Sequence, residues 1–158
     1  MNNKNRDLVM ASVIAAVYAL LTLLSAAFGL SAGPIQIRIS EALCILPCFT
    51  QAAVPGLFIG CLLADLLTGC TPADVIFGSL ATLLGALGTR ALKDRPALAV
   101  LPPILSNTLI IPRVLIFSYH MEAAAGWLSL SIGLSECLSC GVLGLMLHRL
   151  IRRQGICF

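Results

Sequence analysis

Polar and ionisable side chains stand out in this sequence because they interrupt long apolar stretches. Such groups are costly at membrane depth, so they usually pair with one another or line a cavity. They occur in the motifs IQIRISEAL, PGLFIGCLLADLLTG, LSNTLI and SIGLSECLSCG. The residues that we expect to bind a polar solute are Arg38, Glu41, Asp65, Asn107 and Glu136.

Each of these residues also has a purely structural interpretation. Arg38 and Glu41 are three positions apart, so on a helix they would share a face and could pair with each other; alternatively, one or both point into a solute cavity. Asp65 is either a buried hydrogen-bonding residue or a ligand contact. Asn107 either joins two helices or offers its amide, which both donates and accepts, to a base-like ligand.

Glu136 has small neighbours, which would let a ligand approach it closely. Gly133 and Cys140 flank it at positions i−3 and i+4. Cys137 and Cys140 form a C-x-x-C motif, but it lies in an apolar segment and no second pair accompanies it. We therefore expect no metal site and no cofactor, and we expect the seven cysteines to act as packing residues.

The sequence lacks the motifs of common enzymes. It contains no G-x-x-x-x-G-K-[ST], no H-E-x-x-H and no G-x-S-x-G, and no nucleophile stands beside a recognisable base. The basic residues are expected to be membrane anchors rather than a nucleic-acid patch. We predict that the protein is not an enzyme and binds no nucleic acid.

The composition is that of a membrane protein. Of 158 residues, 59% are hydrophobic and 11% are charged, and the mean hydropathy is +1.00. A soluble domain carries about 25% charged residues. A bilayer requires internally satisfied backbone groups, and barrel strands would alternate, so helices are favoured. We expect a single all-α integral membrane domain over residues 1–158, multi-pass in the plasma membrane.

Short polar or Gly/Pro-containing stretches divide the chain into six apolar segments. They cover residues 8–30, 39–53, 55–67, 74–92, 97–119 and 123–151. The second and third are short for full spans, so fewer helices is the alternative. Charge placement favours six transmembrane helices, because six spans put the main Lys/Arg groups on one side, which is then cytoplasmic together with both termini. These groups are Lys4 and Arg6, then Arg90, Lys93 and Arg95, then Arg149, Arg152 and Arg153.

The two remaining basic residues and five of the seven acids fall outside the cytoplasmic loops. The remaining bases are Arg38 and Arg113, and the acids are Glu41, Asp65, Asp74, Glu122 and Glu136. A purely structural membrane subunit would not need so many acids there.

Two stripes of small residues predict close helix packing. Gly56, Gly60 and Ala64 form one, and Ala11, Ala15 and Ala19 form the other. The alanine stripe either packs within the chain or docks to another membrane protein.

The motifs IQIRISEAL, PGLFIGCLLADLLTG, DVIFGSLATLLGAL and LSNTLI resemble the queuosine-precursor transporter family, QueT, over nearly the whole chain. That resemblance implies the substrate-binding S-component of an energy-coupling factor (ECF) importer, which takes up a 7-deazaguanine base such as a pre-queuosine base or queuine. The implied partners are a membrane coupling protein and two cytoplasmic ATPases, with Ala11, Ala15 and Ala19 matching the docking motif. The alternatives are uptake of another vitamin or a purine, or a small structural membrane subunit.

The five candidate residues suit a deazaguanine chemically. Its pyrimidine edge offers adjacent N–H donors, which one carboxylate can accept as a pair; Glu136 is the first choice, with Glu41 or Asp65 next. Its carbonyl oxygen needs a donor, from Asn107 or Arg38. Aminomethyl and queuine forms also carry a cation with which an acid can pair.

Overall fold

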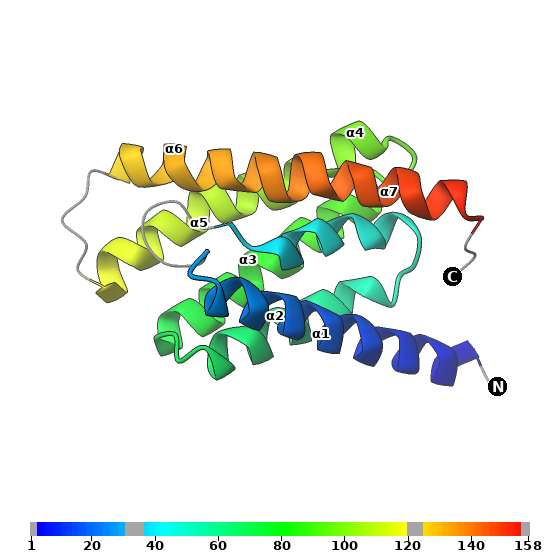
Figure 1. Ribbon diagram of the computed structural model, residues 1–158, viewed down its shortest axis with the longest axis horizontal. Helices are drawn as coiled ribbons and strands as arrows, with labels where there is room; N and C mark the ends of the chain where they lie inside the picture. Colours follow the sequence, from blue (N-terminus) through cyan, green and yellow to red (C-terminus); the bar gives the residue numbers. More distant parts are fainter. Residues whose placement is uncertain (1–2, 31–36, 120–124, 156–158) are drawn as a thin grey trace.

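The computed structural model describes residues 3–30, 37–119 and 125–155, and every element in these ranges is helical (Figure 1). The elements are α1 (Asn3–Ala27), the 3₁₀-helix η1 (Ile39–Cys48), α2 (Ala53–Leu67), α3 (Pro72–Ala91), α4 (Pro96–Ala99), α5 (Leu101–Tyr119), α6 (Ala125–Glu136), the π-helix η2 (Cys137–Leu143) and α7 (Gly144–Arg153). The described ranges contain no strand, so the prediction of an all-helical protein is confirmed.

The chain passes back and forth along the long axis of the molecule. Helices α6, η2 and α7 follow one another as a single rod, and the short α4 precedes α5. Both termini lie at one end of the molecule, and the loop that joins α3 to α4 lies at the same end (Figure 1). This layout follows the six segments that the sequence predicts.

Four of the six segments are long and apolar enough to cross a membrane: Lys4–Ala27, Pro72–Ala91, Pro96–Ser118 and Ala125–Arg153. The other two, η1 and α2, are the segments that the sequence already shows to be short for full spans. At about 2.0 Å per residue η1 extends roughly 20 Å, and at 1.5 Å per residue α2 extends roughly 22 Å, against a hydrocarbon core of about 30 Å. The prediction of six transmembrane helices is therefore confirmed for four segments, by length and composition.

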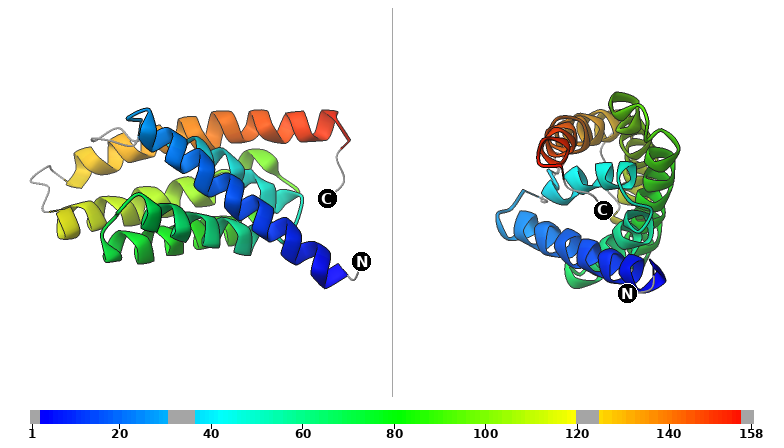
Figure 2. Two further views of the ribbon diagram at one scale, coloured as in Figure 1. Left: turned by 60° about the horizontal axis from the view of Figure 1, so that its bottom comes forward. Right: turned by 90° about the vertical axis from the view of Figure 1, so that its right-hand side faces the viewer.

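The short helix η1 lies inside the molecule. It packs against α1, α2, α3, α7 and η2, and Figure 2 shows it (cyan) between α1 and the α6–α7 rod. Two hydroxyls of α1 anchor its start: Thr22 donates to Ser40 Oγ at 2.7 Å, and Ser25 Oγ accepts from the Ile39 backbone N–H at 3.2 Å. A 3₁₀-helix of 10 residues is unusually long, and 3₁₀ segments of this kind often mark a functional hinge or a strained sequence.

The two small-residue stripes meet each other. A Cβ added at Gly56 would lie 2.8 Å from the Ala11 carbonyl oxygen, and one at Gly60 would lie 2.9 Å from that of Ala15. Only glycine allows this approach of α2 to α1. Ala11, Ala15 and Ala19 are 8%, 5% and 8% exposed, so in this structure the alanine stripe packs within the chain.

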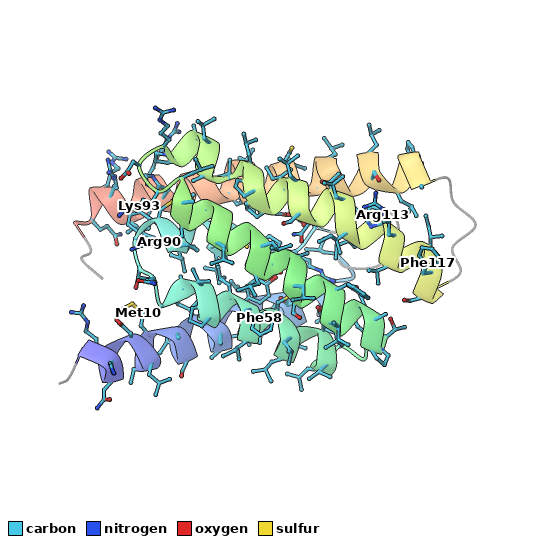
Figure 3. The ribbon with its side chains drawn as sticks, turned by 180° about the vertical axis from the view of Figure 1, so that it is seen from behind. Met10, Phe58, Arg90, Lys93, Arg113 and Phe117 are labelled. Atoms are coloured by element: carbon cyan, nitrogen blue, oxygen red, sulfur yellow. The ribbon has the colours of Figure 1, made fainter. Side chains whose placement is uncertain are left out.

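The outer surface is apolar along its length, while the basic residues gather at one end. Leucines on the outward faces of the helices, such as Leu20, Leu84 and Leu134, are more than half exposed, as expected for contact with lipid. Arg90 and Lys93 lie toward the end that holds the termini, whereas Arg113 and Phe117 lie toward the other end (Figure 3).

Candidate functional site

A small cavity lies between η1, α3, α5 and α6. Its lining comprises Arg38, Glu41, Gly78, Thr82, Asn107, Ile111, Ile132 and Glu136. Four of the five residues that the sequence singles out therefore meet at one place, although they come from three separate parts of the chain. The cavity volume is about 20 Å³, which is room for one water molecule.

The fifth residue, Asp65, does not line the cavity but pairs with Arg38, which does. The two form a salt bridge with Nη1 of Arg38 3.3 Å from Oδ1 of Asp65, and the Asp65 side chain is 1% exposed. The Cys61 thiol donates to the other oxygen, Oδ2, at 3.5 Å. The alternative in which Arg38 pairs with Glu41 is thus wrong, because the arginine pairs with an acid of α2 instead.

Glu41 receives hydrogen bonds at both carboxylate oxygens. The hydroxyl of Tyr18, a fully buried residue of α1, donates to Oε1. The Cys44 thiol donates to Oε2 at 3.1 Å. A buried tyrosine hydroxyl normally finds a polar partner, so the single tyrosine in the apolar stretch of α1 was the available signal for a contact that our sequence reasoning missed.

Glu136 is held in a similar way. Asn107 Nδ2 of α5 donates to its Oε1 at 3.0 Å, and the Cys140 thiol donates to its Oε2 at 3.3 Å. Asn107 therefore joins two helices and lines the cavity at once, so the two interpretations of this residue do not exclude each other.

Three acids each have a cysteine thiol about one helical turn away on the same segment: the two that line the cavity, and Asp65. The pairs are Glu41–Cys44, Asp65–Cys61 and Glu136–Cys140, with S···O distances of 3.1, 3.5 and 3.3 Å. The expectation that these cysteines only fill space is incomplete. The i+3, i−4 and i+4 spacings were the signal that sequence reasoning did not use.

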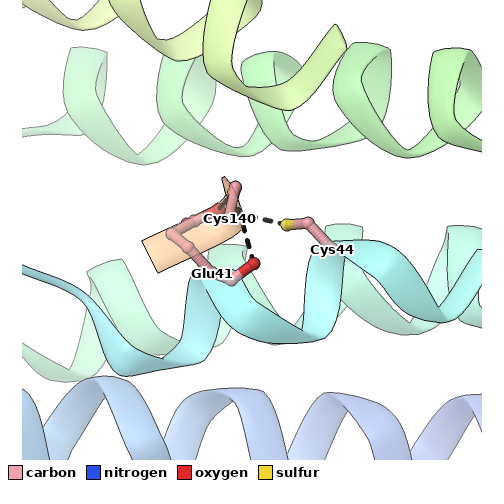
Figure 4. Close-up of side chains that lie close together, drawn as sticks. All are labelled: Glu41, Cys44 and Cys140. Atoms are coloured by element: carbon pink, nitrogen blue, oxygen red, sulfur yellow. Dashed lines mark hydrogen bonds between the residues drawn. The ribbon is translucent and has the colours of Figure 1, made fainter. Parts of the chain in front are cut away.

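Cys44 and Cys140 come together although they are far apart in the sequence. Their thiols and the Glu41 carboxylate form one buried cluster, with Cys140 Sγ 3.8 Å from Glu41 Oε2 (Figure 4). Cys137, the other cysteine of the C-x-x-C motif, is exposed while Cys140 is buried, so the two do not form a shared site.

The other charges outside the cytoplasmic loops have different positions. Asp74 is buried in the first turn of α3, where its backbone N–H donates to the capping Thr71. Arg113 is exposed and donates to the Leu109 carbonyl oxygen of its own helix at 2.8 Å, so it does not line the cavity. Glu122 lies outside the described residues.

The cavity is suited to bind a polar solute that carries N–H donors. Two carboxyls and the Asn107 side chain face it, and Arg38 adds a strong donor. Because the cavity holds about one water, its walls must move apart to admit a larger solute. Glu41 lies in the 3₁₀-helix η1, and Glu136 directly precedes the π-helix η2. Turns of π-helix are frequent at functional sites.

A second depression lies on the outside, between the first half of α1 and the start of α2. It has a volume of about 310 Å³, and its lining includes Leu8, Ala11, Ser12, Ala15, Pro55 and Ile59. Two alanines of the predicted docking stripe therefore reach the floor of an external groove, even though most of their surface is buried.

The comparisons with known proteins agree with one another. The model of the QueT transporter family matches residues 8–153. The queuosine precursor transporter QueT of Lactococcus lactis subsp. cremoris (strain MG1363) is 37% identical over 82 residues, which are 52% of this chain and 48% of the relative. The chain thus spans about half the length of the curated relative that it matches. No solved structure matches the chain.

Proposed function

Because the chain belongs to the QueT transporter family, we propose that it is the substrate-binding S-component of an ECF importer and that it captures a 7-deazaguanine queuosine precursor from outside. The observation that carries this proposal is the convergence of Arg38, Glu41, Asn107 and Glu136 on one small cavity. The family consists of transporters, not enzymes.

Glu136 is the residue that we assign to the pyrimidine edge of the base. Two adjacent N–H groups of a deazaguanine can donate to one carboxylate, which strengthens both bonds because the acceptor is charged. Asn107, which already contacts Glu136, supplies an acceptor through its amide oxygen. Arg38 supplies the donor for the carbonyl oxygen of the base.

The charges around the cavity favour a cationic ligand. Glu41, Glu136 and Asp65 contribute three carboxyls, and Arg38 contributes one guanidinium. A ligand with an aminomethyl cation would offset part of this negative charge. Among the precursors we therefore expect the aminomethyl form to bind more tightly than the neutral cyano form.

Binding requires the cavity to expand, and η1 is the element that we expect to move. Arg38 lies just before it and Glu41 lies in its first turn, so a shift of η1 away from α3 and α6 would open the space between the candidate groups. The IQIRISEAL segment, which contains Arg38 and Glu41, would then order the site around the base.

The proposed orientation places both termini and the basic end of the molecule in the cytoplasm, following the positive-inside rule. The external groove beside Ala11 and Ala15 lies toward the N-terminal end of α1. The predicted docking of Ala11, Ala15 and Ala19 to a membrane coupling protein requires that groove to widen, because all three alanines are buried and Ala11 and Ala15 pack against α2. Two cytoplasmic ATPases would complete the importer.

Uptake of a labelled aminomethyl deazaguanine tests this function. The recipient cells should lack their own uptake route and should make this chain alone, or with a coupling protein and two ATPases of an ECF module. The proposal predicts accumulation only when the module is present and ATP is available. Accumulation by the chain alone at the same rate would contradict the S-component assignment.

A further inference from the structure

We propose that Glu41, Cys44 and Cys140 form a binding site for a thiophilic metal ion of the Zn²⁺ or Cd²⁺ class. One donor atom from each residue lies within 4.8 Å of the other two, and all three side chains are buried (Figure 4). Thiolate and carboxylate groups are the ligands that Zn²⁺ takes in proteins.

The spacing of the donors is that of a tetrahedral site. With Zn–S near 2.3 Å and Zn–O near 2.1 Å, a tetrahedral angle separates sulfur from oxygen by about 3.6 Å. Oε2 of Glu41 lies 3.1 Å from Cys44 Sγ and 3.8 Å from Cys140 Sγ. The two values bracket the expected separation, so an ion can enter with small shifts of the side chains.

The donors are also held in place before any ion arrives. Glu41 and Cys44 lie one turn apart on η1, and Cys140 comes from η2, which packs against η1. Cys140 Sγ additionally lies 3.3 Å from the backbone oxygen of Glu41. Since the protein has already ordered these groups, little conformational entropy is lost on binding.

Glu136 lies next to the cluster but outside the three donors that are all within 4.8 Å of one another, so a water molecule would complete a four-coordinate site. Oε2 of Glu136 lies 3.3 Å from Cys140 Sγ, and both Glu41 and Glu136 line the cavity. Glu41 therefore belongs both to the cavity lining and to the thiol cluster. Metal binding displaces the two thiol protons to solvent, so the affinity should rise with pH.

The metal site has a consequence that rests on the proposed function. An ion bound to Glu41 and approached by Glu136 would occupy two of the groups assigned to the deazaguanine. We therefore expect the metal ion and the base to exclude each other, so that Zn²⁺ weakens base binding competitively.

The test is a Cd²⁺ titration of the purified, reduced full-length protein in detergent, followed by the ultraviolet charge-transfer absorption of cadmium thiolates. One ion per chain is expected. Cys44→Ser and Cys140→Ser, which each keep one thiol of the site, should each weaken the band and lower the affinity for Cd²⁺ by about tenfold or more, and the double variant Cys44→Ser/Cys140→Ser should lose the band. The matched control, Cys137→Ser, changes an exposed cysteine of the same segment and should leave both unchanged. A band that keeps its full intensity in the double variant would overturn the proposal.

A second measurement keeps the proposal testable if either site variant fails to fold. The ¹¹³Cd NMR spectrum of the wild-type protein distinguishes sulfur from oxygen ligation. A resonance in the range of mixed thiolate and oxygen ligands is expected, whereas one in the range of oxygen ligands alone would overturn the site.

The metal site and the deazaguanine site are tested separately by these measurements. Cadmium ligation by the two cysteines in a protein that binds no deazaguanine supports the metal site and refutes the base assignment. Base binding in a protein that shows no thiolate ligation of cadmium supports the base assignment and refutes the metal site. If both ligands bind but do not compete, the shared use of Glu41 is refuted.

Discussion

The two carboxyls that face the cavity are each held by two donors. Glu41 accepts from Tyr18 and Cys44, and Glu136 accepts from Asn107 and Cys140. Buried polar groups without partners cost free energy, so these contacts explain how an apolar protein keeps acids in its interior. Two of the four donors are weak thiols, which leaves the carboxylates able to exchange a thiol for a stronger ligand donor.

Replacing Glu136 by Gln should weaken deazaguanine binding while the protein stays folded. Glutamine has the same shape and keeps one oxygen acceptor, but it loses the charge that strengthens the paired bonds to the base. We expect a loss in affinity of roughly 10- to 100-fold, or about 1.5–3 kcal/mol, measured by isothermal titration calorimetry. Asp94→Asn, at an exposed loop position, is the matched control. A variant that unfolds instead would mean that Glu136 serves structure.

Arg38 and Asp65 should behave as one unit in stability. Arg38→Gln alone leaves Asp65 buried without its partner, at a cost of about 3–5 kcal/mol in the free energy of unfolding. The double variant Arg38→Gln/Asp65→Asn removes both charges and should recover most of that loss in thermal unfolding. If Arg38 binds the carbonyl oxygen of the base, affinity stays low in the double variant. Full recovery of affinity would exclude Arg38 from the site.

Sequence reasoning found most of the candidate site but not what surrounds it. The five residues stood out because charge and amide groups are rare in apolar segments. Four of them line one cavity and Asp65 pairs with Arg38 outside it, although their role in binding stays a prediction. The contact of Tyr18 with Glu41 and the meeting of Cys44 with Cys140 were missed because they depend on tertiary packing between α1, η1 and η2.

At the scale of the elements, the close approach of α1 and α2 links packing to the site. A Cβ at Gly60 would lie 2.9 Å from both the Ala15 carbonyl oxygen and the Tyr18 Cβ. A side chain at this position must therefore push on the residue whose hydroxyl holds Glu41.

Gly60→Ala should lower the stability of the protein and weaken base binding together. Overpacking of a tight contact costs roughly 1–3 kcal/mol, and the displaced Tyr18 would pull on Glu41. Gly126→Ala is the matched control because a Cβ there meets nothing within 4 Å and alanine favours a helix by about 0.8–1 kcal/mol. Thermal unfolding and calorimetry of the two variants check this. Equal melting temperatures for both would contradict the close packing of α1 on α2.

The boundaries of the helices were largely predictable, and their geometry was not. The segment at 74–92 corresponds to α3 (Pro72–Ala91), where Thr71 and Pro72 provide a helix cap and a first-turn proline. The segment at 39–53 instead forms a 3₁₀-helix that ends at Cys48. Apolar periodicity does not separate the two helix types over so few turns, and the burial of η1 on several sides depends on the rest of the fold.

At the scale of the whole molecule, the basic end should face the cytoplasm. The connection between η1 and α2 lies at the end that holds the termini, and the start of α6 lies at the opposite end (Figure 1). A cysteine introduced as Gln51→Cys should therefore be protected from an impermeant maleimide in intact cells, whereas Gly126→Cys should be labelled. Both should react after permeabilisation. The reverse pattern in intact cells would invert the topology.

Recognition of a deazaguanine by the folded protein is the central claim, and ligand-induced thermal stabilisation tests it most directly. The purified protein in detergent is heated with queuine, aminomethyl and cyano deazaguanines, guanine and several vitamins. A specific ligand at about 100- to 1,000-fold excess over its Kd stabilises by about 2.7–4.1 kcal/mol. We predict a shift with the deazaguanines, largest for the aminomethyl form. A shift with a vitamin alone, or no shift with any compound in a folded protein, would contradict the account.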